Sequence, residues 1–106
     1  MAVIILPDAQ DDLLSLQAYM LGKRDELAWI NAEDEIFTKL ASVDAGVFNG
    51  TPIQELADVG IFEYQNVFTS HHKLVCRRID GDASVYLVAG HRQDFSTLLI
   101  KRLLRR

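Results

Sequence analysis

The sequence predicts an α+β fold in which an N-terminal strand and a two-helix hairpin pack on a small antiparallel sheet, with a short C-terminal helix. Apolar residues of the first half recur every three or four positions, which is typical of amphipathic helices. The second half instead contains short β-branched runs around an Asp-Gly dipeptide, which indicates strands joined by a hairpin turn. The chain has 106 residues, the length of one domain, so we treat residues 1–106 as a single domain.

The first strand and the first helix are expected in the opening residues. The run AVIIL, residues 2–6, is short and β-branched and therefore predicts a strand. Apolar residues then recur at helical spacing, at Leu13, Leu16 and Met20. We expect Asp8 to be the N-cap of this helix, because an aspartate there accepts bonds from free backbone N–H groups, and we expect Gly22 to end it.

The second helix is longer and follows a polar link at residues 22–26. Its apolar residues form one stripe, comprising Trp29, Ala32, Ile36, Leu40 and Val43. Because the link is short, the two helices are expected to form an antiparallel hairpin, and a sheet must cover its apolar side. We expect the stripe to be core rather than a contact for a partner. A loop that contains Gly and Pro, residues 43–55, ends the helical part.

Strands follow this loop. Residues 61–68, IFEYQNVF, alternate enough to predict a strand with one solvated face. Residues 73–79 and 84–90 flank Asp80-Gly81, the strongest local signal for a β-hairpin in the chain. The second of these segments is apolar on both faces, so we expect a central strand with a neighbour on each side.

The last segment turns from strand to helix at residues 91–94, HRQD. The helix that follows is amphipathic, with apolar residues at Phe95, Leu98, Leu99 and Leu103. We expect Asp94 to be its N-cap. His91 is expected to have a structural role, as a hydrogen-bonding partner of the start of this helix.

The composition argues against several classes of site and location. No apolar run approaches the about 20 residues that cross a bilayer, and no signal peptide is apparent, so we expect a cytoplasmic protein without membrane contact. The lone Cys76 forms no internal disulfide and is expected to be a buried, unreactive thiol. His72 and Cys76 are four residues apart on one strand, roughly 13 Å at about 3.3 Å per residue, which is too far to share a zinc ion. We therefore expect no metal and no cofactor.

Charge is distributed unevenly along the chain, whose formal net charge is -4. Residues 1–66 contain three basic and twelve acidic side chains, whereas residues 67–106 contain eight basic and three acidic ones. Such asymmetry favours a surface that meets an acidic partner. The alternative is that the two oppositely charged parts face each other.

Three segments resemble, in this order, the RelE/ParE superfamily of bacterial type II toxins: ILPDAQDDLLSLQAYML, KLVCRRIDGD, and HRQDF leading into LLIKRLLR. The resemblance covers nearly the whole chain. It implies two N-terminal helices packed on a small antiparallel sheet, a role in growth inhibition under stress, and a cognate antitoxin that binds the toxin in a hetero-oligomer. Many members have an aromatic residue in place of Cys76 and Arg in place of Lys73, so neither position carries a functional expectation.

The superfamily contains two kinds of toxin. RelE-like members cut mRNA on the ribosome, which requires a base, an acid and cations for the phosphate, and the candidates here are His91, Arg78 and Glu63. ParE-like members are taken to inhibit DNA gyrase and have no nuclease site. Ribosome ligands gain affinity from Lys and Arg, whereas this chain is acidic and residues 44–66 contain neither. The sequence therefore favours a ParE-like binder over an enzyme, with the mRNA endonuclease as the alternative.

On this interpretation the basic residues of the second half bind the partner or the target. We expect one positive face, made of Arg77, Arg78, Arg92, Lys101, Arg102 and Arg105, with Arg106 beside them. The alternative for the terminal residues is a solvated helix end, because cations are stabilised at the C-terminus of a helix.

Overall fold

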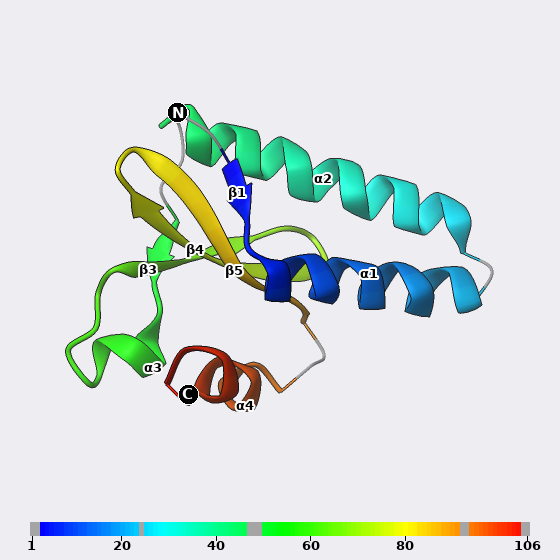
Figure 1. Cartoon of the computed structure of the whole chain (residues 1–106). Coiled ribbons are helices and arrows are strands. Elements are labelled where there is room, and N and C mark those ends of the chain that lie inside the picture. Colours follow the sequence, from blue (N-terminus) through cyan, green and yellow to red (C-terminus); the bar gives the residue numbers. More distant parts are fainter. Residues whose placement is uncertain (1–2, 24, 47–49, 92–93, 105–106) are drawn as a thin grey trace.

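A computed structural model describes the chain except for residues 1–2, 24, 47–49, 92–93 and 105–106. The elements are, in order, β1 (Val3–Ile5), α1 (Pro7–Gly22), α2 (Glu26–Asp44), β2 (Thr51–Pro52), α3 (Gln54–Ala57), β3 (Tyr64–Phe68), β4 (His72–Ile79), β5 (Asp82–Gly90), α4 (Phe95–Leu99) and a π-helical turn, η1 (Ile100–Leu104). The α+β class and the predicted succession of elements are confirmed (Figure 1), and β2 and α3 are additional.

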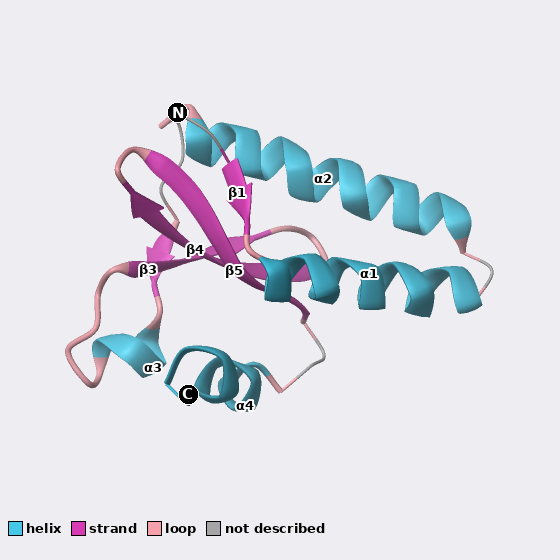
Figure 2. Ribbon diagram, in the orientation of Figure 1, coloured by secondary structure: helices cyan, strands magenta, loops and turns pink. Residues whose placement is uncertain are grey.

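The five strands form one sheet in the order β1-β5-β4-β3-β2. β5 lies between β1 and β4, so the prediction of a central strand with two neighbours is confirmed (Figure 2). The sheet is mixed rather than wholly antiparallel, because β1 pairs with β5 in parallel while the other pairs are antiparallel. A parallel pair needs a long connection, and here α1, α2, α3 and three strands lie between β1 and β5 in the chain.

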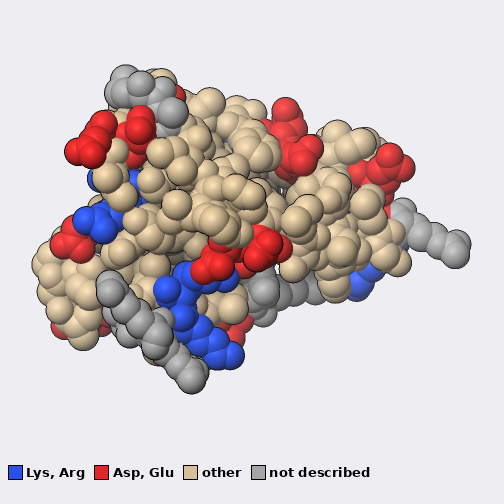
Figure 3. All heavy atoms as spheres, in the orientation of Figure 1, with Lys and Arg blue, Asp and Glu red and all other residues tan. Residues whose placement is uncertain are grey.

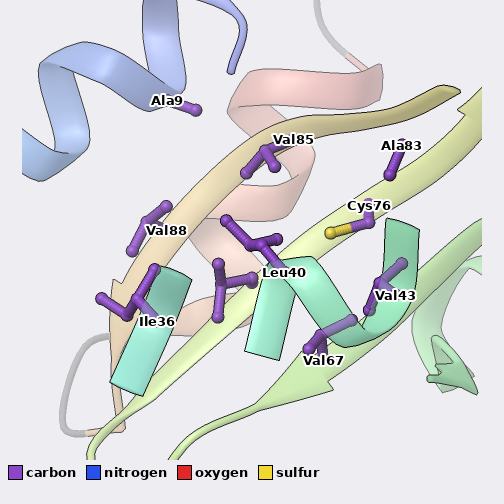
Figure 4. Packing of buried hydrophobic residues seen from close by; sticks show 10 residues of the cluster. Ala9, Ile36, Leu40, Val43, Val67, Cys76, Ala83, Val85 and Val88 are labelled. Atoms are coloured by element: carbon purple, nitrogen blue, oxygen red, sulfur yellow. The ribbon is translucent and has the colours of Figure 1, made fainter. Parts of the chain in front are cut away.

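Helices cover both faces of the sheet. α1 and α2 lie on one face, and α3 and α4 lie on the other (Figure 1). The predicted stripe of α2 is buried along its whole length. Figure 4 shows Ile36, Leu40 and Val43 of this stripe among side chains of the sheet. The sheet side chains there are Val67, Cys76, Val85 and Val88. A second cluster packs under α3 and α4: Ile53, Leu56, Val75, Leu87, Ala89, Phe95 and Leu99.

The β4–β5 hairpin contains a two-residue turn and a bulge. Asp80 and Gly81 have φ values of 52° and 85°, the left-handed conformation that a type I′ turn requires at both positions, so the predicted turn is confirmed. Further along, Cys76 pairs with Val85 but Val75 pairs with Leu87. Tyr86 is therefore the extra residue of a β-bulge.

The helix ends agree with the sequence except at the first N-terminus. Gly22 ends α1, and the carboxylate of Asp94 accepts a bond from the N–H of Thr97, 3.2 Å away, as an N-cap of α4. The prediction that Asp8 caps α1 is wrong. The helix begins at Pro7, whose ring fixes a helical φ and leaves no N–H to be capped, so Asp8 lies within the first turn.

The predicted loop at residues 43–55 also needs correction. Its end contains β2, which pairs with β3, and α3, which buries Leu56. Gly50 permits the close approach of β2, because a Cβ at this position would lie 2.5 Å from the carbonyl oxygen of Asn66. β3 itself begins at Tyr64, three residues after the predicted start of the strand. Elements this short have too few residues to show a period in the sequence.

Candidate functional site

The three candidate nuclease residues do not form one site. β4 begins beside the end of β5, since His72 pairs with Gly90, and His91 directly follows that pair. Arg78 lies six residues further along β4, roughly 20 Å away at about 3.3 Å per residue. There it lines a hollow of about 470 Å³ together with Glu63. Glu63 and Arg78 therefore share one end of the hairpin, and His91 lies at the other.

The two neighbouring arginines of β4 lie on opposite faces of the sheet. Arg78 donates hydrogen bonds to the carbonyl oxygens of Gly81 and Val43, the latter at the end of α2. The guanidinium of Arg77 lies over the ring of Tyr64, 5.6 Å from its centroid, and this ring packs against the cluster under α4. Adjacent residues of a strand point to opposite faces, so these two side chains extend away from each other, although both residues border the hollow.

Arg102 is bound within the protein. Its two terminal nitrogens donate to the two carboxylate oxygens of Asp12, at 2.9 and 3.0 Å, and Nη1 also donates to the carbonyl of Tyr86 at 2.7 Å. Hydrogen bonding to Asp12 raises the pKa of Arg102. Asp12 accepts a further bond from the N–H of Val88, 3.0 Å away. This arrangement satisfies the carbonyl of the bulge and a β5 N–H that lies beyond the end of β1.

The expectation of one positive face therefore needs correction. Arg102 pairs with Asp12, Arg77 and Arg78 point apart, and Lys101 is exposed. Arg92, Arg105 and Arg106 lie outside the described residues. Figure 3 shows the Lys and Arg atoms on one face in separate groups, some of them directly beside Asp and Glu atoms. In part, the oppositely charged segments of the chain face each other, which was the alternative interpretation of the charge asymmetry.

A groove of about 700 Å³ runs between the second half of α1 and the adjacent ends of β4 and β5. It is lined by Asp12, Ser15, Leu16, Tyr19, Met20, His71, His72, Val88, Gly90 and His91. All three histidines of the chain thus line one cavity. The sequence contained a signal for this cluster, because a His-His pair begins one strand and a Gly-His pair ends the strand that pairs with it.

His91 has a structural hydrogen bond, but its partner is not the terminal helix. Its Nε2 lies 3.1 Å from the carbonyl oxygen of Thr69, and its backbone N–H donates to the carbonyl of His71. The ring lies nearly parallel to that of Phe68, with the centroids 6.4 Å apart. Since a carbonyl only accepts, the proton of the neutral ring is on Nε2 and the lone pair of Nδ1 faces away from this bond.

His72 is the buried member of the cluster, with 5% of its surface exposed. Burial lowers its pKa, and the charges of His71 and His91 act in the same direction, whereas Glu35 opposes them. Among the described residues, no partner bonds to its Nδ1. Glu35 accepts bonds from the backbone N–H and the hydroxyl of Ser70, at 2.8 and 2.7 Å, and these bonds lower its pKa.

The remaining chemically distinctive residue is Cys76. It is buried against α2, and burial raises the pKa of its thiol to about 12, as expected for an unreactive cysteine. In the part of the chain that the structure describes, no three His, Cys, Asp or Glu side chains are placed to hold a metal ion. No helix among the described residues is long and apolar enough to cross a membrane.

Comparison with known protein families and curated proteins found no match for the chain: no protein-family model matches it, and no curated protein matches it at a significant level.

Proposed function

We propose that the chain is the toxin of a type II toxin–antitoxin pair of the RelE/ParE kind, and that it acts as a ParE-like inhibitor of DNA gyrase in the cytoplasm. A cognate antitoxin neutralises it by forming a complex. The α+β arrangement of a first strand, a helical hairpin, an antiparallel β3–β4–β5 unit and a terminal helix supports the first part of the proposal.

The separation of His91 from Arg78 and Glu63 supports a gyrase inhibitor over an mRNA endonuclease. In-line cleavage of RNA needs a base, an acid and a cation within hydrogen-bond reach of one phosphate. A base at one end of β4 and a cation six residues away cannot act on the same phosphodiester. The internal ion pair of Arg102 removes a further cation from the set that could bind RNA.

The outer surface of the helical hairpin supports a function through protein contacts. Large apolar side chains are exposed there, at Leu14, Leu21, Leu27, Ile30 and Phe37. Leu14 and Leu21 are seven residues apart on α1, and Ile30 and Phe37 are seven apart on α2, so each pair shares a helix face. Monomeric proteins rarely expose large contiguous apolar areas, and such areas commonly mark protein-binding sites.

The test is a paired assay on the purified chain, with gyrase supercoiling in one tube and mRNA on translating ribosomes in the other. We expect supercoiling to be inhibited and the mRNA to stay intact. The variant His91→Gln should inhibit gyrase as well as the original chain does, since no catalysis by His91 is involved. Phe37→Glu should weaken inhibition, whereas Thr38→Glu, which adds the same charge at the next exposed position, should not.

Other outcomes would contradict the proposal. Cut mRNA with normal supercoiling, abolished by His91→Gln, would establish the RelE-like endonuclease instead. Absence of both activities, together with no growth defect on expression in bacteria, would show that the chain is a binding module without toxicity.

A further inference from the structure

The groove between α1 and the ends of β4 and β5 has the size and lining of a ligand site. Its volume of about 700 Å³ falls within the range of pockets that hold small organic ligands. Its walls are largely apolar, with Leu16, Met20 and Val88 beside the ring of Tyr19. Polar groups are few and come from opposite sides, with Ser15 on α1 and the three histidines at the strand ends.

The charges around the groove favour an anion. The carboxylate of Asp12, which lines it, is already bonded to Arg102 and to the N–H of Val88. Glu35, which acts electrostatically on His71 and His72, is bonded to Ser70. A cation lies at the tyrosine wall, since Nζ of Lys23 is 4.8 Å from the ring centroid of Tyr19. Of these two carboxylates, Asp12 is therefore neutralised by an arginine, whereas Glu35 keeps its charge but does not line the groove. Imidazole and ammonium groups remain on the other sides of the groove.

Two of the histidines have nitrogens that the described residues leave available. The Thr69 carbonyl holds the proton of His91 on Nε2, so Nδ1 is the atom that takes up the second proton when the ring becomes a cation. Nδ1 of His72 is buried and has no partner among the described residues. An unsatisfied buried nitrogen destabilises the fold, and a ligand or water that reaches it recovers part of this cost.

We propose that this groove binds a small amphipathic anion. Its apolar or aromatic body lies against Leu16, Met20 and Val88, and its carboxylate or phosphate head lies among the three histidines that line the groove. A protonated imidazole donates a charge-assisted hydrogen bond to such a head group, and an unperturbed imidazole is protonated in mild acid. The proposal does not depend on the toxin function.

The test uses the full chain and three probes that share a benzene ring: phenyl phosphate, phenylacetate and uncharged benzyl alcohol. Histidine side-chain ¹⁵N NMR reports contact directly, and calorimetry gives the affinity. We expect saturable binding of one or both anions, with a dissociation constant of about 1 mM or below, and tighter binding at pH 6 than at pH 8. Benzyl alcohol should bind much more weakly. A preference for phenyl phosphate or phenylacetate would identify the head group.

Variants locate the site. His71→Gln and His91→Gln should each weaken anion binding about tenfold, the value of roughly one charge-assisted hydrogen bond. Arg77→Gln, which removes a positive charge near the other end of β4, is the matched control and should not change the affinity. Ser15→Trp fills the groove from the exposed side of α1 and should abolish binding without altering any charge. This variant tests the site even if a histidine variant does not fold.

Four results would overturn the proposal. Binding of benzyl alcohol as tight as that of the anions would show that no head-group site exists. Equal weakening by Arg77→Gln would show nonspecific attraction, and binding that survives Ser15→Trp would place the ligand elsewhere. Absence of saturable binding of either anion at millimolar concentration would exclude the site.

Discussion

Asp12 and Arg102 lie ninety positions apart in the chain, yet their side chains form a two-point ion pair at the edge of β5. The pair joins the first turns of α1 to η1, which packs on the other side of the sheet. It also satisfies two backbone groups, the carbonyl of Tyr86 and the N–H of Val88. A contact between the acidic and the basic part of the chain thus stabilises the fold.

Removing Asp12 should destabilise the protein. Asp12→Ala removes the two-point partner of Arg102, about a fifth of whose side chain is exposed, and leaves it the Tyr86 carbonyl and a 3.7 Å contact with Asp8. It also leaves the Val88 N–H unbonded. We expect the free energy of unfolding to fall by about 2–3 kcal/mol, measured by urea denaturation. Arg102→Met, which keeps the apolar stem, should cost less, about 1–2 kcal/mol.

The double variant tests whether the two residues act together. If they do, the loss in Asp12→Ala combined with Arg102→Met should be smaller than the sum of the single losses by about 1 kcal/mol or more. Additive losses would show that the two side chains contribute independently. Asp11→Ala, at an exposed neighbouring position of α1, is the control and should change stability little.

His72 should make the fold sensitive to mild acid. Burial lowers its pKa in the folded chain, whereas the unfolded chain binds this proton near the ordinary value of about 6.5. The unfolded state then holds more protons, so the free energy of unfolding decreases as the pH falls below about 6.5, by at most about 1.4 kcal/mol per pH unit. His72→Phe should reduce this decrease, measured as the difference between the free energies of unfolding at about pH 7.5 and about pH 5.5.

Two comparisons make the histidine prediction specific. His71→Gln removes an exposed ring and should retain most of the acid sensitivity. Glu35, whose pKa is lowered by its bonds to Ser70, contributes stability that is lost only as the pH falls through about 4.5 and below. A decline between pH 7.5 and pH 5.5 that persists in His72→Phe would assign the effect to other groups.

Cys76 should react with thiol reagents only through unfolding. Its side chain is buried, and burial raises the pKa of the thiol to about 12, so the thiolate is scarcely populated at pH 8. Labelling with an aromatic disulfide reagent is expected to be very slow in buffer and rapid in denaturing urea. Fast labelling of the native protein would mean that the cluster under α2 opens readily.

The β4–β5 turn should depend on Gly81. Its φ of 85° lies in the left-handed region, which costs an L-residue with a Cβ about 1 kcal/mol or more. Gly81→Ala is therefore expected to lower the free energy of unfolding by about 1–2 kcal/mol. Gly22→Ala is the control, since a Cβ there meets nothing within 4 Å and its φ is not positive, and it should be neutral or slightly stabilising. Equal effects would argue against a strained turn.

The sequence by itself determined the features that depend on near neighbours in the chain. The stripe of α2, the Asp80-Gly81 turn and the Asp94 N-cap were all predictable, because helical period, left-handed φ and capping involve residues within a few positions. The local errors were the first N-cap, since the helix begins at Pro7, and the short elements β2 and α3 within the predicted loop.

The tertiary structure decided everything that depends on residues distant in the chain. It paired Arg102 with Asp12, separated His91 from Arg78, placed β1 parallel to β5 and brought the three histidines to one groove. Local spacing cannot show which ends of two strands adjoin, because strand order and register are set by burial of both faces of the sheet. The fold class therefore followed from the sequence, whereas the chemistry of each basic and imidazole side chain followed from the neighbours that folding gave it.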